Sequence, residues 1–124
     1  MPVLSKTTYW EKSFMLGLSK LIVLSVLRNG PVHGYGIIKE IETKSDQCCS
    51  ITPGSIYPLL REHEKDGLIV SHKSKVGGRD RVNYELTEAG RETLKEGLKM
   101  WEVFLKGTRN IFYDDDAPEI AEQS

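Results

Sequence analysis

Four basic side chains lie close together on either side of two adjacent glycines, Gly77 and Gly78. They are Lys73, Lys75, Arg79 and Arg81, and one acid, Asp80, lies among them. A glycine pair between extended segments is typical of a hairpin tip, so these charges are expected on a protruding ribbon. Such a ribbon suits the phosphates and the minor groove of nucleic acid. The alternative is an ordinary solvated hairpin, because charged strands also guard against aggregation.

A second set of candidate contact residues lies where a helix is predicted to begin. Thr52 is a suitable N-cap, and Pro53 suits the first helical position, where its missing N–H costs nothing. The free N–H groups and the dipole at such an end favour an anion, and small side chains allow a phosphate to approach closely. The contact residues predicted in this helix, with its cap, are Thr52, Gly54, Ser55, Tyr57, Pro58 and Arg61.

For three of these residues the sequence also predicts something other than DNA contact. Pro58 cannot donate an N–H to the carbonyl of Gly54, which predicts a bend that costs up to about 3 kcal/mol unless that carbonyl finds another partner. Tyr57 is alternatively half within the core, and Arg61 is alternatively a plain surface residue.

The residue types that could support catalysis or metal binding do not assemble in the sequence. His33, His63 and His72 fall on different predicted elements, and no acid recurs at a catalytic spacing from them. Cys48 and Cys49 are adjacent, unlike the two-residue-spaced pairs of zinc sites. We therefore expect no enzyme activity, no metal and no cofactor. For the two cysteines, a zinc site, a thiol redox switch and ordinary loop residues remain open.

The length and charge of the chain indicate one mildly basic domain with an acidic end. The sequence has 124 residues, of which 17 are basic and 18 acidic, and five of the acids lie between Asp114 and Glu122. The remaining body therefore has 17 bases and 13 acids, which permits a polyanionic partner. Residues 113–124 are predicted to be a disordered acidic tail. The alternative is a tail that mimics DNA phosphates and is autoinhibitory.

The sequence favours a cytoplasmic protein without a membrane partner. No apolar run reaches the roughly 18 residues of a membrane span, and Lys20 interrupts the richest stretch, residues 14–27. No secretory signal is recognised. Adjacent cysteines cannot supply the disulfide framework of a small secreted domain, so a reducing compartment fits.

Hydrophobic periodicity and turn residues predict a mainly α protein with a β-hairpin. The expected elements are helix 13–28, helix 35–43, helix 53–66, strand 68–75, strand 82–86 and helix 87–107. This order is typical of a winged helix-turn-helix, in which the third helix enters the major groove and the hairpin is the wing. The expected segments are an N-terminal arm 1–12, a DNA-binding domain 13–86, a C-terminal dimerisation helix 87–112 and the tail 113–124.

The first and last predicted helices carry more apolar surface than so short a chain can cover. The first has apolar residues on two faces, and the last repeats them at intervals of three and four residues, as in a two-helix contact. A second subunit would supply the missing cover. The predicted interface consists of Leu16, Val23, Leu94, Leu98, Trp101 and Leu105.

Five short segments occur in order along the chain. They are His33-Gly34-Tyr35, Thr52 to Leu60, Asp66 to Ile69, Gly78-Arg79 and Tyr84 to Gly90. Together they resemble the PadR family of prokaryotic transcriptional regulators, over a stretch from about Leu16 to Leu94. The resemblance implies a homodimer held by the first and last helices, a recognition helix from Pro53 to Asp66 and a wing from Leu68 to Leu86. It also implies binding of double-stranded DNA at a palindromic operator, usually as a repressor. The single C-terminal helix is similar to that of the smaller members.

Two residues add to this comparison. Some family members bind flat aromatic drugs through a tryptophan of the last helix, so the resemblance implies a small aromatic effector beside Trp101, with plain packing as the alternative. His63 stands where the family usually has leucine facing the core, which predicts a satisfied or partly exposed histidine, with a pH sensor as the alternative. A different class of function also remains, a winged helix that binds proteins and has no DNA binding of its own.

Overall fold

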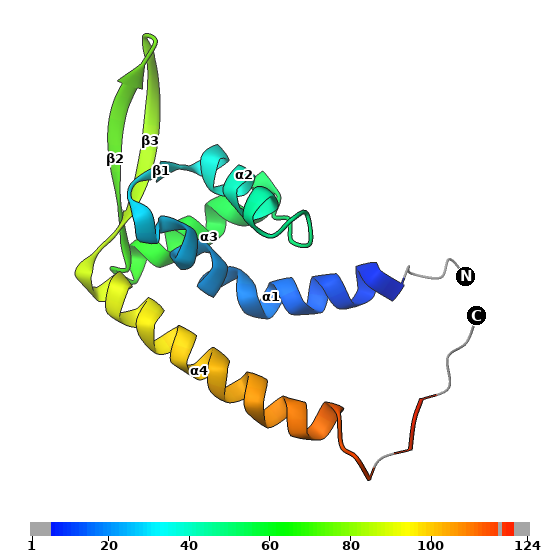
Figure 1. Ribbon diagram of the computed structural model, residues 1–124. Helices are drawn as coiled ribbons and strands as arrows, with labels where there is room; N and C mark the ends of the chain where they lie inside the picture. Colours follow the sequence, from blue (N-terminus) through cyan, green and yellow to red (C-terminus); the bar gives the residue numbers. More distant parts are fainter. Residues whose placement is uncertain (1–5, 117, 121–124) are drawn as a thin grey trace.

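The computed structural model describes residues 6–116 and 118–120. Its elements in chain order are α1 (Lys6–Val26), the 3-10 turn η1 (Leu27–Asn29), β1 (Val32–His33), α2 (Gly34–Lys44), α3 (Pro53–Lys65), β2 (Ile69–Val76), β3 (Arg79–Leu86) and α4 (Glu88–Phe112). The hairpin of β2 and β3 projects beyond the helices, and α4 passes beneath α1 (Figure 1). The predicted class, mainly α with a β-hairpin wing, is confirmed.

The core lies where α1, α2 and α3 meet the base of the hairpin. It forms because α2 and α3 each have an apolar stripe, at the three- and four-residue spacing that the sequence shows, and because the end of α1 adds Val23, Leu24 and Val26. Its buried side chains are Val23, Leu24, Val26, Leu27, Ile37, Ile38, Ile41, Ile51, Ile56, Leu59, Leu60, Ile69, Leu86 and Leu94.

The wing is a tight antiparallel hairpin in a three-stranded sheet of order β1-β3-β2. Gly77 and Gly78 form its two-residue tip with φ of 58° and 79°, a backbone that glycine adopts without strain. The strands continue to this tip, so β2 ends one residue later than predicted and β3 begins three residues earlier. The short strand β1 was not predicted, because Val32 and His33 are too few to show an alternation, yet they pair with Tyr84 and Asn83.

The first helix differs most from its prediction. It begins at Lys6 rather than Ser13, so residues 6–12 extend α1 and the expected N-terminal arm is wrong for them, while residues 1–5 lie outside the described chain. Its end is tightened into η1 before Gly30, whose φ of 136° ends the helical backbone. No helix of the described chain is long and apolar enough to cross a membrane.

The start of α4 is fixed to the wing and to the end of α3. The Oγ1 atom of Thr87, the N-cap of α4, accepts the N–H of Gly90 at 3.0 Å, and the Thr87 hydroxyl donates to the carbonyl of Gly67 at 2.6 Å. The N–H of Leu68 bonds the carbonyl of His63 at 2.9 Å, which closes the end of α3 around Gly67. These bonds hold α3, the wing and α4 at one corner of the molecule.

Candidate nucleic-acid interface

Helix α3 separates the residues predicted to contact DNA from those of the core. Ile56, Leu59, Leu60 and His63 are buried. All six predicted contact residues of this helix and its cap are exposed, namely Thr52, Gly54, Ser55, Tyr57, Pro58 and Arg61. The outer face of α3 is therefore free within the subunit to contact another molecule.

The N-terminus of α3 differs in one detail from the prediction. Thr52 has the extended backbone of an N-cap, but its side chain accepts no N–H of the helix and instead donates to Oγ of Ser55 at 3.2 Å. Gly54 beside it is open, since a Cβ there would meet only Oγ1 of Thr52 at 3.9 Å. No packing within the described subunit requires glycine at this position. Its lack of a side chain suits a close approach by an external group.

Tyr57 belongs to both the core and the surface. A Cβ on Gly34 would lie 2.7 Å from Cε1 of Tyr57, so the tyrosine ring lies directly on the backbone of α2. The side chain is nevertheless 38% exposed. The alternative of a half-buried Tyr57 is therefore correct, and its exposed part remains available to a ligand.

The outer face of α3 continues into the base of the wing. The hydroxyl of Ser71 in β2 donates to Oε2 of Glu64 in α3 at 2.7 Å. Burial, with the neighbouring Tyr57 as the next cause, raises the pKa of Tyr84 in β3. The helix and the hairpin thus form one continuous surface rather than two separate ones.

The four predicted wing cations, Lys73, Lys75, Arg79 and Arg81, are all exposed. In the ladder, Lys75 lies opposite Asp80 and Arg81 opposite Ser74. The ion pairs among the described residues are Lys20–Glu62 at 2.8 Å and Lys44–Glu40 at 3.6 Å, and neither involves the wing. The positive charge of the wing is therefore not neutralised by a described acid.

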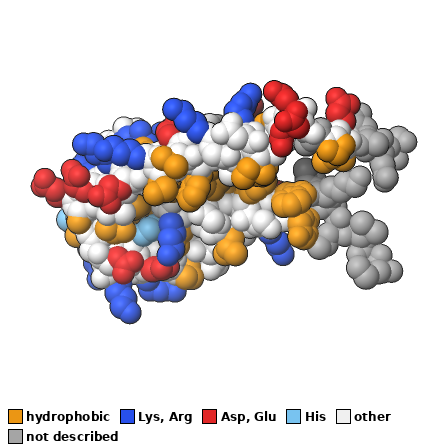
Figure 2. Space-filling model, turned by 90° about the horizontal axis from the view of Figure 1, so that it is seen from below, with side chains coloured by type: hydrophobic (Ala, Val, Ile, Leu, Met, Phe, Trp, Pro, Cys, Tyr) orange, Lys and Arg blue, Asp and Glu red, His pale blue; other side chains and the backbone are white. Residues whose placement is uncertain are grey.

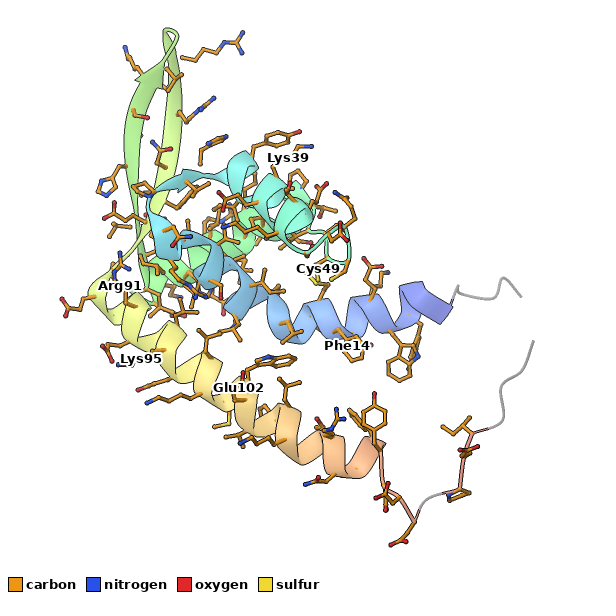
Figure 3. The ribbon with its side chains drawn as sticks, in the orientation of Figure 1. Phe14, Lys39, Cys49, Arg91, Lys95 and Glu102 are labelled. Atoms are coloured by element: carbon orange, nitrogen blue, oxygen red, sulfur yellow. The ribbon has the colours of Figure 1, made fainter. Side chains whose placement is uncertain are left out.

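Sequence reasoning missed two exposed side chains of α2. The ammonium of Lys39 lies 5.3 Å from the centre of the Tyr35 ring, and Tyr35 is 55% exposed. Lys39 lies on the side of the body from which the wing rises (Figure 3). The spacing of four residues on a helix was the available signal.

His63 is more buried than expected. Its side chain is 3% exposed, and Nε2 lies 3.3 Å from the carbonyl oxygen of Lys20, within hydrogen-bond distance. Burial lowers the pKa of His63, although the Lys20 carbonyl and the charge of Glu62 act in the opposite direction. The histidine is therefore satisfied within the core, in the place where a leucine was expected.

The predicted dimer residues fall into two groups. Val23 and Leu94 are 0% and 5% exposed, so they belong to the core of the subunit and their assignment to an interface is wrong. Leu98 is half-buried, whereas Leu16, Trp101 and Leu105 remain exposed. Apolar side chains form a band along the face seen from below, where α4 lies (Figure 2).

Trp101 lines a pocket of about 590 Å³ between α1, the end of α2 and α4. Leu98, Ile41 and Cys49 line the same pocket, and Arg28 and Lys44 lie at it. Its volume is within the range of small-molecule sites. A small aromatic effector beside Trp101 stays a prediction.

Comparisons with known proteins agree with this geometry. The model of the PadR-like family of transcriptional regulators matches residues 23–96. The transcriptional regulator Rv3488 of Mycobacterium tuberculosis is 33% identical over 91 residues, which cover 73% of this chain and 82% of that protein. A PadR family transcriptional regulator from Eggerthella lenta is 28% identical with a TM-score of 0.75, over 86% of this chain and 92% of that one.

One similar solved structure contains nucleic acid. Bacillus subtilis PadR, in complex with operator DNA, has a TM-score of 0.61 over 86% of this chain and 52% of that one, and at 23% identity it shows a shared fold. The family match spans more than half of the chain, from α1 through the recognition helix and the wing into α4. The chain therefore belongs to the PadR-like family of transcriptional regulators.

Proposed function

We propose that this protein binds double-stranded DNA as a homodimer and represses transcription from a palindromic operator. The observation that carries the proposal is the exposed wing, whose four cations have no ion-pair partner among the described residues. Lysine and arginine at such a position neutralise phosphates and release counterions. The operator complex of Bacillus subtilis PadR, which shares the fold, supports DNA as the partner.

The outer face of α3 supplies the base-contacting part of the proposed complex. In a helix-turn-helix the second helix lies in the major groove, where its N-terminal residues contact the base edges, and the first helix crosses the DNA backbone. The open Gly54 and the exposed Ser55 suit the first role, and Lys39 of α2 suits a phosphate contact in the second. Arg61, farther along α3, is long enough to reach the duplex from the same exposed face.

Exposed apolar surface on α1 and α4 supports the homodimer. Leu16 is 85% exposed, Phe14 61%, Val103 60% and Phe104 58%, and Phe14 points to the side on which α4 lies (Figure 3). Monomeric proteins rarely leave contiguous apolar patches of this kind open to water. A symmetric pair of subunits matches a palindromic operator, because each wing and each α3 then contacts one half-site.

A gel shift on the DNA upstream of the protein's own gene, at several salt concentrations, tests the proposal. The variant is Arg79→Ala with Arg81→Ala, and the control is Lys95→Ala with Lys99→Ala, which removes the same charge from α4. Each lost phosphate contact lowers the salt slope by about 0.9, so four cations of a dimer account for up to about 3.6. We expect weaker binding and a smaller slope in the wing variant alone. A half-site probe should bind far more weakly than the full palindrome.

An equal loss of DNA affinity in both double variants would mean that the wing makes no specific contribution to DNA binding. No shift with the upstream DNA, followed by none with a random library of duplexes, would refute DNA binding. That result would favour the second class of function, a winged helix that binds proteins. Pairing of Arg79 and Arg81 with acids would have supported this alternative, and neither arginine has an ion-pair partner among the described residues.

A further inference from the structure

Cys48 and Cys49 form a pair of free thiols that the proposed DNA contacts do not use. Their Sγ atoms lie 2.9 Å apart, Cys48 is exposed and Cys49 is half-buried. The loop between α2 and α3 holds them in place: Oγ of Ser45 accepts the N–H of Cys49 at 3.1 Å, and the carbonyl of Ser45 accepts the N–H of Cys48 at 3.1 Å. Both sulfurs can therefore bond to one atom without a rearrangement of the loop.

One member of the thiol pair, Cys49, lines a mostly apolar pocket. Cys49 lines the pocket of about 590 Å³ together with Ile22, Ile41, Leu98 and Trp101. Its side chain points from the loop toward α1 (Figure 3). A ligand bonded to the two sulfurs can thus place an apolar group among these side chains, where burial of an aromatic ring is favourable.

The number of available ligands excludes the usual metal site here. Structural zinc is held by four protein ligands. The described residues contain no group of three or more histidine, cysteine, aspartate or glutamate side chains that could hold an ion. Two thiols fit zinc less well than they fit an atom that binds sulfur strongly, needs only two protein ligands and has its third bond to carbon. Trivalent arsenic with one organic substituent has this valence, and it prefers soft thiolate ligands as other soft centres do.

We propose that Cys48 and Cys49 bind a trivalent arsenical with a single aryl substituent, and that the aryl group occupies the pocket beside Trp101. The site uses none of the residues proposed to contact DNA, and it shares Leu98 and Trp101 with the predicted dimer interface.

The reaction balances without an oxidant. The thiol of Cys48, the exposed member, adds to the As=O group of an aryl arsenoxide and gives an S–As bond and an As–OH group. Cys49 then forms the second S–As bond, the As–O bond breaks, and the Cys49 proton leaves with hydroxide as water. The hydrogen bond with Cys48, followed by burial, raises the pKa of Cys49 to about 11, so this thiol retains its proton until the leaving group takes it. Arsenic remains trivalent and both sulfurs remain reduced.

The test is a titration of the reduced full chain with phenylarsine oxide, in the absence of DNA. Because the chain has two tryptophans and five tyrosines, a Trp10→Phe background, excited at a wavelength that tyrosine does not absorb, makes Trp101 the only reporter of fluorescence. Native mass spectrometry should show one phenylarsenic group per chain, with a change in Trp101 emission. Cys48→Ser and Cys49→Ser should each weaken binding about 100-fold, because a single bond loses the intramolecular advantage of the second.

A comparison with inorganic arsenite tests the pocket separately from the thiols. The quantity to compare is the ratio of the affinity for phenylarsine oxide to the affinity for arsenite. This ratio should be about tenfold larger for the folded protein than for the same chain unfolded in urea, since only the folded chain offers an apolar pocket. An equal preference in both states would overturn the pocket site. Full binding by either serine variant would overturn the paired-thiol site. If a serine variant fails to fold, as judged by circular dichroism, the bound arsenical is instead challenged with competing thiols on the wild-type chain. Release by 2,3-dimercaptopropanol but not by a monothiol would support bonding to both cysteines. Release by both reagents would contradict the paired-thiol site.

Discussion

Replacement of Gly54 by alanine should separate the stability of the fold from contact with DNA. Within the subunit the new methyl group would meet only Oγ1 of Thr52, at 3.9 Å, which is an ordinary van der Waals distance. Alanine is favoured over glycine in a helix interior by up to about 1 kcal/mol. Gly54→Ala should therefore leave the free energy of unfolding unchanged or slightly increased.

The same methyl group would stand between the first turn of α3 and a phosphate in the proposed complex. A hydrogen bond to a charged group contributes about 1.5–3 kcal/mol, and its loss weakens binding roughly tenfold for each 1.4 kcal/mol. We therefore expect the Kd for the operator to rise about tenfold or more for each subunit that loses the contact. The change should appear at every operator sequence alike, because a phosphate contact carries no base information.

Fluorescence anisotropy with a labelled operator, at one fixed salt concentration, measures the Kd, and thermal unfolding of the free protein measures stability. Gly107→Ala in α4 is the matched control, because a Cβ there meets no atom within 4 Å. It should change neither quantity by much. Unchanged operator affinity in Gly54→Ala, with the fold intact, would refute the idea that the start of α3 approaches the DNA backbone.

Two further predictions concern the body of the subunit. Burial lowers the pKa of His63 below its unfolded value of about 6.5, so the unfolded chain takes up a proton more readily than the folded one. The contribution of His63 to the free energy of unfolding should be fully present above about pH 6.5 and should decrease as the pH falls below that value. Urea denaturation at several pH values measures this dependence. If His63→Leu showed the same decrease in the free energy of unfolding with falling pH as the wild type, the prediction would be contradicted. Gly90→Ala would bring a Cβ against the carbonyl oxygen of Leu68, a backbone atom that cannot move aside. We expect this substitution to destabilise the protein by about 3 kcal/mol, and a melting temperature equal to that of Gly107→Ala would contradict the close contact.

The sequence predicted the elements that have a local signal. The Thr52-Pro53 pair fixed the start of α3 to the residue, although Thr52 contributes backbone geometry rather than a capping hydrogen bond. Gly77-Gly78 predicted the position of the wing tip, because both residues of this tip have positive φ, which favours glycine. The strand β1 could not be predicted because it exists only through its pairing with β3, which joins residues about fifty positions apart.

The exposure of the predicted contact residues is confirmed, whereas two of the predicted interface residues are buried, and the reason for the difference is physical. Charged side chains and the start of a helix indicate exposure directly, so the wing cations and Gly54 are exposed as expected, while their contact with DNA stays a prediction. Periodicity indicates only that one side of a helix is covered, and it does not say by what. Val23 and Leu94 satisfy the pattern of a two-helix contact, but their partners are in their own subunit. Tyr57 shows the same limit, because its neighbour Gly34 lies on another helix.

The exposed surfaces of the subunit divide by chemistry in a way that lets both proposed contacts form together. The cations that have no ion-pair partner among the described residues lie on the hairpin of β2 and β3, and the last turn of α3 adjoins the base of this hairpin through the Ser71–Glu64 hydrogen bond. Most of the large apolar side chains that remain exposed lie instead on α1 and on α4, which passes beneath α1 (Figure 1), although Val70, Val76 and Val82 of the wing are exposed as well. A second subunit can therefore cover the apolar helices without covering the wing. Because Thr87 joins α4 rigidly to the base of the wing, the packing of two α4 helices would set the distance between two wings, and hence the spacing of the half-sites.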